Sequence, residues 1–209
     1  NFLQMFSAAP FLLSGVSNGG KNLTLTSTNA KTGSLQESTG NEFIKGCLLH
    51  ISYNMWEDRI APERPRRGYR PFLRLEQSLW DRVINAMADA GLNLAVLDMG
   101  DGVRYESHPE IAVKNAWSRR KLRNELEKLR DLGIEPIPKM NFSTSHDAWL
   151  GPYARMVSTE QYYTVCEDLI SEVTDLFDGP RFFHLGMDEE TARHQRYYNY
   201  VSLRQGDLW

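Results

Sequence analysis

The chain of 209 residues is long enough to bury one substantial core. Its 41% hydrophobic and 24% charged residues are ordinary for a soluble globular protein. A net charge of −3 argues against a general nucleic-acid binder, and no apolar run reaches the ~18 to 20 residues that a membrane-spanning helix needs.

The first residues are typical of the tail of an export signal. Residues 1–16 join Asn-Phe-Leu-Gln to an apolar run rich in small side chains, which resembles the stretch after the arginine pair of a twin-arginine signal peptide. An ordinary amphipathic segment is the alternative. Residues 17–41 are rich in Ser, Thr, Asn, Gly and Lys, which predicts a flexible linker. We expect an exported protein, periplasmic or extracellular, with a folded domain over 42–209.

From residue 46 onward, apolar strands alternate with amphipathic helices. Strands are predicted at 46–53, 93–98, 134–142 and from 181. The first predicted helix covers 76–90. The second begins after Ser118 as its N-cap and ends at Gly133, and the third begins at a capping box formed by Ser158 and Gln161. The apolar stripe of the first helix is Leu79, Trp80, Val83, Ile84 and Met87. That of the second is Leu122, Leu126, Leu129 and Leu132, and that of the third is Tyr162, Val165, Cys166, Leu169, Ile170 and Val173.

This alternation is typical of α/β folds with a parallel sheet, either open and doubly wound or closed into a barrel. No Gly-rich phosphate loop follows the first strand, which argues against the open nucleotide-binding sheet. Polar side chains follow every strand, and in a barrel those ends converge on one mouth. They are His50, Ser52 and Asn54; Asp98 and Asp101; Lys139, Asn141 and His146; and His184, Asp188 and Glu189. Since a complete barrel takes about 250 residues, we expect the first half of a (β/α)8 TIM-type barrel, and a chain that is a fragment.

Two long segments between these elements are further candidates for ligand contacts. Residues 59–74 form a Pro- and Arg-rich loop, either simply solvated or binding an acidic or hydroxyl-rich ligand. Residues 98–117 form a second insertion, and its run from Arg104 to His108 could fold as a hairpin over the mouth. Asp98, Asp101 and His108 are conceivable metal ligands, but their spacing matches no calcium-loop pattern. Cys47 and Cys166 are interpreted as buried thiols. We expect no metal and no cofactor.

Aromatic residues after the third and fourth strands suit a carbohydrate ligand or, equally, burial within loops. They are Trp149, Tyr153, Tyr197, Tyr198 and Tyr200.

The stretch 181–190, Arg-Phe-Phe-His-Leu-Gly-Met-Asp-Glu-Glu, carries the clearest chemistry. Alternation along a strand puts Phe183, Leu185 and Met187 on one face and His184, Gly186 and Asp188 on the other. Adjacent carboxylates with a nearby histidine can supply a general acid and a charge-stabilising partner. We expect His184 to orient Asp188 by a hydrogen bond. A solvated acidic turn is the alternative.

This motif resembles the His-x-Gly-x-Asp-Glu pattern of family 20 glycoside hydrolases, the β-N-acetylhexosaminidases, with His184, Gly186, Asp188 and Glu189 in the matching positions. The resemblance implies a (β/α)8 barrel, Glu189 as general acid, and Asp188 orienting the substrate acetamido group, which acts as nucleophile. Leu132 to Pro138, followed by His146, is similar to the third-strand segment of the family.

The sequence departs from the family pattern at the other strand ends. Lys139 and Asn141 stand where the family has Glu and Asp, and His50 and Tyr53 stand where it has Asp and a sugar-anchoring Arg. We expect a carbohydrate-cleaving enzyme with Asp188 and Glu189 as catalytic residues. The predicted substrate-binding residues are His184, His146, Asn141, Asp98 and Asn54. The alternatives are a non-catalytic carbohydrate-binding barrel and, less favoured, a metal-dependent hydrolase.

Overall fold

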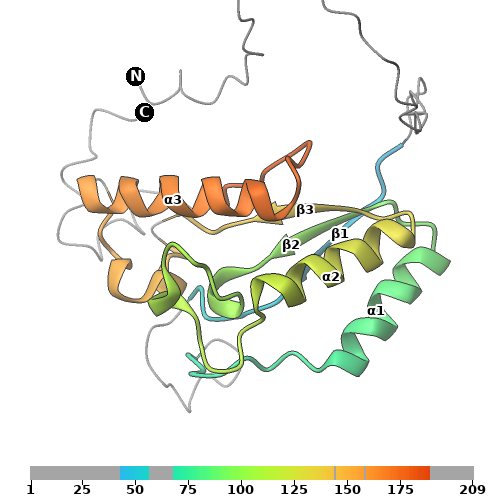
Figure 1. The fold of residues 1–209 in the computed structure, drawn as a ribbon, viewed down its shortest axis with the longest axis horizontal. Coiled ribbons are helices and arrows are strands. Elements are labelled where there is room, and N and C mark those ends of the chain that lie inside the picture. Colours follow the sequence, from blue (N-terminus) through green and yellow to red (C-terminus); the bar gives the residue numbers. More distant parts are fainter. Residues whose placement is uncertain (1–42, 57–67, 144, 158, 189–209) are drawn as a thin grey trace, which may run out of the picture. The chain divides into compact units, whose positions relative to one another are not determined.

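The computed structural model describes residues 43–56, 68–143, 145–157 and 159–188 (Figure 1). The predictions for residues 1–42, Arg64 to Arg67, Ser158, Glu189 and the tyrosines beyond it lie outside the described residues. The main elements alternate as the sequence predicts. They are β1 (Gly46–His50), α1 (Gln77–Asp89), β2 (Leu94–Asp98), α2 (Arg119–Asp131), β3 (Glu135–Lys139) and α3 (Glu160–Leu176). Short 3₁₀ helices η2 (Gly100–Gly102), η3 (Pro109–Ile111) and η4 (Ala148–Tyr153) lie in the connections.

The helix ends follow from local hydrogen bonding and backbone freedom. Ser118 Oγ accepts a hydrogen bond from the Lys121 amide at 3.1 Å, which satisfies one free donor of α2. Gly133 follows α2 with φ of 74°, a left-handed conformation that glycine adopts without steric cost. The cap of α3 is Thr159, whose hydroxyl accepts from the Tyr162 amide, so the prediction from Ser158 was one residue early.

The apolar stripes of the three helices pack into one core with the sheet. Trp80, Ile84 and Met87 of α1 are buried, but Leu79 is 50% exposed, which corrects that part of the predicted stripe. The stripes of α2 and α3 are buried as predicted, with Leu132 and Ile170 partly so. Cys166 is buried, Cys47 is half-buried, and both are free thiols.

The sheet is parallel and adds its strands in sequence order, β1-β2-β3. Because all three helices share a core with Ala95, Leu97 and Met99, they cover the same face of the sheet. A doubly wound sheet would reverse its order and place helices on both faces. The opposite face carries the in-register row Leu48, Val96 and Ile137, of which Leu48 is exposed.

The predicted fourth strand is present only as a single parallel bridge between Lys139 and His184. The His184 amide donates to the Pro138 carbonyl at 2.9 Å, and the Met140 amide donates to the His184 carbonyl at 3.0 Å. The preceding hydrogen bond of a parallel ladder would run from the amide of residue 138 to the carbonyl of residue 182, and proline has no amide hydrogen. Pro136 removes the amide donor one step earlier in the same ladder. These prolines explain why the pairing stays short.

The run from Arg104 to His108 contains no strand and so does not form the predicted hairpin. Val103 forms an isolated parallel bridge with Trp117, and Phe72 forms one with Lys114. The 3₁₀ helix η3 lies between Val103 and Trp117 in the chain. Within the described part of the chain, no helix has the length and apolar character to cross a membrane.

Candidate functional site

The carboxyl ends of the strands bring four predicted polar positions into one row. His50 pairs in register with Asp98, Asp98 with Lys139, and Lys139 with His184. Positions in register on neighbouring parallel strands share a face of the sheet, so these side chains lie on the face opposite the helices. The sequence prediction that polar residues gather at one end of the sheet is confirmed in this row.

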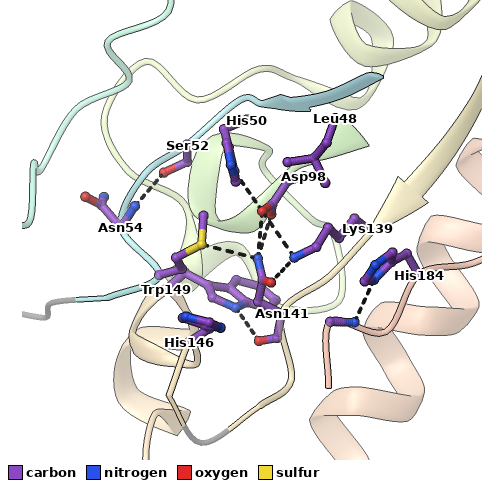
Figure 2. A network of polar contacts seen from close by, with 12 residues as sticks. Leu48, His50, Ser52, Asn54, Asp98, Lys139, Asn141, His146, Trp149 and His184 are labelled. Carbon is purple, nitrogen blue, oxygen red and sulfur yellow. Dashed lines mark hydrogen bonds and ion pairs between the residues drawn. The ribbon is translucent and has the colours of Figure 1, made fainter. Parts of the chain in front are cut away.

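Asp98 is the centre of the cluster in Figure 2, and its side chain is 1% exposed. The Asn141 amide nitrogen donates to both Asp98 carboxylate oxygens, at 2.8 Å each. His50 Nδ1 lies 2.9 Å and Lys139 Nζ 3.5 Å from Asp98 Oδ2. Lys139 also donates to the Asn141 side-chain oxygen. A buried carboxylate is thus balanced by a buried ammonium and by hydrogen bonds, as low-dielectric surroundings require.

The backbone of Asn141 is held in place by Trp149. The indole Nε1 donates to the Asn141 carbonyl at 2.7 Å, and the Trp149 side chain is 1% exposed. Trp149 is therefore a core residue that supports the cluster and presents no face to a ligand. Tyr153 donates to Glu110, away from the cluster.

A second buried carboxylate, Asp101, lies near enough to Asp98 to feel its charge. It accepts hydrogen bonds from the Ser52 hydroxyl and from Asn54 Nδ2, the latter at 2.8 Å. Burial raises the pKa of Asp101 to about 6, the hydrogen bonds oppose this, and the Asp98 charge adds to it. Asn54 also exchanges two 2.8 Å hydrogen bonds with the Arg70 backbone. The amide of Asn54 therefore holds the loop, and its contact with substrate stays a prediction.

The end of the fourth segment carries Asp188, an exposed side chain. Its Oδ2 lies 3.4 Å from His146 Nδ1, and the Ser143 hydroxyl is 3.3 Å from the same nitrogen. His184 instead accepts a hydrogen bond from the Gly186 amide at 3.0 Å. The histidine beside Asp188 is thus His146 and not His184, which corrects that expectation. Met187, predicted to share a face with Phe183 and Leu185, is exposed, whereas those two residues pack against the core.

Gly186 explains how this segment approaches β3. It has φ of 61°, and a Cβ at this position would lie 2.5 Å from the Met140 carbonyl oxygen and 2.7 Å from Asn141 Oδ1. Only glycine has both the backbone freedom and the absence of a side chain that this contact requires.

Two aromatic residues beside the carboxyl end of β1 were not among the predicted site residues. Tyr53 and Trp56 follow β1, with ring centroids 6.0 Å apart. Trp56 also lies 6.1 Å from the His146 ring, edge to face. The signal in the sequence was an aromatic pair at i and i+3 directly after a strand whose end carries polar residues.

The metal alternative finds no geometric support among the described residues, where no group of three or more His, Cys, Asp and Glu side chains could hold an ion. His108 lies against Asp168, 3.0 Å from its carboxylate, and against Glu110, at 3.2 Å. It is thus held at α3 and η3.

The sequence matches no protein-family model, and no curated protein matches it. Solved structures do match. A chitobiase from Flavobacterium johnsoniae has a TM-score of 0.56 and 17% identity, over 77% of this chain and 26% of that one. Two structures of Streptomyces plicatus N-acetyl-β-hexosaminidase each match with a TM-score of 0.53 and 14% identity. One is in complex with thio-NAglucal, and the other is a mutant in complex with N-acetylglucosamine. Those matches cover 77% of this chain and 35% and 37% of theirs.

The chain therefore spans well under half the length of the proteins that it matches, and at these identities the likeness concerns the fold. The α/β arrangement of parallel strands with helices on one face distantly resembles part of the fold of the family 20 β-N-acetylhexosaminidases.

Proposed function

We propose that this chain is the first half of a (β/α)8 barrel that cleaves a glycosidic bond at the carboxyl ends of its strands. In this proposal Glu189 is the general acid and Asp188 the assisting carboxylate. A strand order without reversal and helices on a single face support the barrel. The fold likeness to hexosaminidases supports the class of reaction.

The observation that carries the proposal is the position of Asp188. It follows a segment paired with β3, lies 3.4 Å from His146, and is exposed to solvent and thus to a ligand. Asp188 lies at the end of the chain's fourth β segment, the kind of position where a barrel carries its catalytic groups. A carboxylate beside an imidazole can stabilise developing positive charge or orient an acetamido group. Glu189 follows it in the chain and supplies the second carboxyl group.

The test is the leaving-group dependence of hydrolysis in the protein expressed with the residues that flank this chain in its gene. Glu189→Gln keeps the shape and removes the acid, so glycosides with poor leaving groups should be cleaved about 10² to 10⁴ times more slowly. Glycosides whose leaving group needs no proton should lose much less. Turnover of both substrate classes is measured for wild type and variant.

Asp188→Asn is the matched comparison, because it removes the neighbouring charge without touching the acid. It should slow both substrate classes alike, since the Asp serves the sugar and not the departing oxygen. Equal losses for both classes in Glu189→Gln would deny it the acid role. A wild type inactive on every glycoside tested would favour the second candidate.

That second candidate is a non-catalytic carbohydrate-binding barrel, and one observation favours it. His50, Lys139 and Asn141, three positions that depart from the family pattern, all contact Asp98. Both Asp98 oxygens are engaged by these neighbours, so the cluster is satisfied within the protein. A carboxylate held in this way is not available to a reacting sugar, as expected of a barrel that has lost its chemistry.

Export is proposed alongside the function, from the signal-like residues 1–16. A mature protein whose mass lacks this segment would support export, and its retention on a cytoplasmic protein would refute it.

A further inference from the structure

We infer that Tyr53 and Trp56 form a stacking platform for a pyranose ring, which we call the aromatic platform. The inference rests on the proposed carbohydrate function and names the residues that would bind the sugar. Both side chains follow β1 at the end of the sheet where the polar row lies. Their ring planes are tilted by 41° with centroids 6.0 Å apart, so neither ring covers the face of the other.

The aromatic platform joins the two polar parts of the site. The Tyr53 ring lies 4.9 Å from the His50 ring, which contacts Asp98. Trp56 lies between two histidines, 6.3 Å from His50 and 6.1 Å from His146. His146 in turn contacts Asp188. One histidine therefore separates the aromatic platform from each carboxylate.

Exposure separates this pair from the other aromatic residues nearby. Tyr53 is 50% exposed and Trp56 is partly exposed, whereas Trp149 is buried in the core. A tyrosine exposed to this extent beside a buried ionic cluster offers an apolar surface next to polar groups. Sugar rings match that combination, because their C–H faces are apolar and their edges carry hydroxyl groups.

The chemistry of the cluster makes the aromatic platform the main sugar contact in this half of the site. Asp98, Lys139 and Asn141 bind one another and are buried, so they leave little for a ligand hydroxyl. Tyr53 stands where the resembling family has its sugar-anchoring arginine. Recognition at this position then depends on the face of the ring and not on an ionic hydrogen bond.

The experiment measures binding and not turnover. The probes are N-acetylglucosamine and its reduced, open-chain form N-acetylglucosaminitol, which keeps the acetamido and hydroxyl groups but has no ring. Calorimetric titration of the protein should show tighter binding of the ring form. Tyr53→Ala and Trp56→Ala should each weaken that binding about 10-fold, the scale of one aromatic contact. Tyr53→Phe keeps the ring and should stay within about twofold of wild type.

The matched control is Phe182→Ala, which removes an aromatic ring of similar exposure outside the cluster and should leave binding unchanged. Equal affinity for the ring and open-chain forms, or unchanged affinity in both alanine variants, would overturn the aromatic platform. So would a wild type that does not bind N-acetylglucosamine. If Trp56→Ala does not fold, Tyr53→Ala decides alone, since its side chain is half exposed.

The outcome is independent of the acid assignment. If Glu189→Gln retains full turnover while Tyr53→Ala loses sugar affinity, the catalytic proposal fails and the aromatic platform stands. If Glu189→Gln shows the expected leaving-group dependence while both alanine variants bind normally, the enzyme proposal stands and the aromatic platform fails.

Discussion

At the scale of single residues, Asp98 and Lys139 show how the cluster compensates its own charges. The Asp98 side chain is 1% exposed and the Lys139 side chain 9%. Neither charge has enough water to solvate it, so each depends on the other and on Asn141. Removing one charge alone leaves its partner buried and uncompensated.

We expect Asp98→Ala to lower the free energy of unfolding by about 3 to 5 kcal/mol, the cost of leaving one member of a buried pair unpaired. Adding Lys139→Met should restore part of that loss, because the second charge is then removed too. Urea unfolding of wild type, both single variants and the double variant completes the cycle. Additive effects would show that the two charges do not depend on each other.

For Asp101, in contrast to Asp98, the protonated and neutral form is the one that favours the folded state. Burial raises its pKa to about 6, above the ordinary value of 3.8 expected for the unfolded chain. Between these two values the folded state binds the proton more tightly than the unfolded state does. The contribution of Asp101 is therefore most favourable below about pH 4 and is lost as the pH rises through about 6.

The change is roughly 3 kcal/mol, from about two pH units at 1.36 kcal/mol each. Asp101→Asn removes it and keeps the shape, since the new amide can donate to the Ser52 hydroxyl and still accept from Asn54. We expect the stability of wild type relative to Asp101→Asn to decrease between pH 4 and pH 7. Urea unfolding of both proteins across this range is the measurement, and a constant difference would contradict the raised pKa.

At the scale of elements, β3 determines how the fourth segment attaches. Pro136 and Pro138 remove donors on the side that faces residues 181–185, so few backbone hydrogen bonds hold the segment there. The close approach at Gly186 partly replaces them. It brings the segment against Met140 and Asn141 and so carries the chain toward Asp188.

Gly186→Ala should therefore cost more than a left-handed conformation alone. The matched control is Gly133→Ala, which has a similar positive φ but no atom within 4 Å of the added methyl group. We expect about 1 to 2 kcal/mol for the control, and a further 1 to 3 kcal/mol, roughly, for the overlap at Gly186. Equal losses in urea unfolding would mean that the segment moves away from β3 without cost.

At the scale of the whole molecule, the helices cover one face of the sheet, and the other face has an exposed apolar residue at its β1 edge. Parallel sheets are usually covered on both faces, yet Leu48 on the second face is exposed. Among the described residues, no strand pairs with the outer edge of β1. A groove of about 380 Å³ runs along that edge, bordered by the exposed side chains of Leu48, Phe72 and Leu79.

Such an edge favours association with other chains. We expect the isolated chain of residues 1–209 to be oligomeric or poorly soluble when measured by light scattering after size-exclusion chromatography. Leu48→Lys, which places a charge at the exposed β1 edge, should shift it toward monomer. Ala86→Lys, on the exposed side of α1, should not. A monomeric wild-type chain with a cooperative unfolding transition would contradict the half-barrel proposal.

The sequence alone predicted the elements and the order in which they follow one another. Apolar periodicity located three helices and three strands, because burying one face of each element demands that spacing. The gathering of polar strand ends was also predictable, since parallel strands bring their carboxyl ends together.

Only the tertiary structure decided which side chains meet. Asp98 is more than forty residues away from Lys139 and Asn141 in the chain, and their contacts depend on how β2 and β3 pair. A long crossover through α2 joins these two parallel strands, so no tight turn fixes their register. The contact between His146 and Asp188, which come from different loops, also depends on the tertiary structure. So does the exposure of Leu79, which lies beside the open edge of β1. Local sequence sets periodicity and backbone preference, whereas a contact between distant residues exists only once the sheet has assembled.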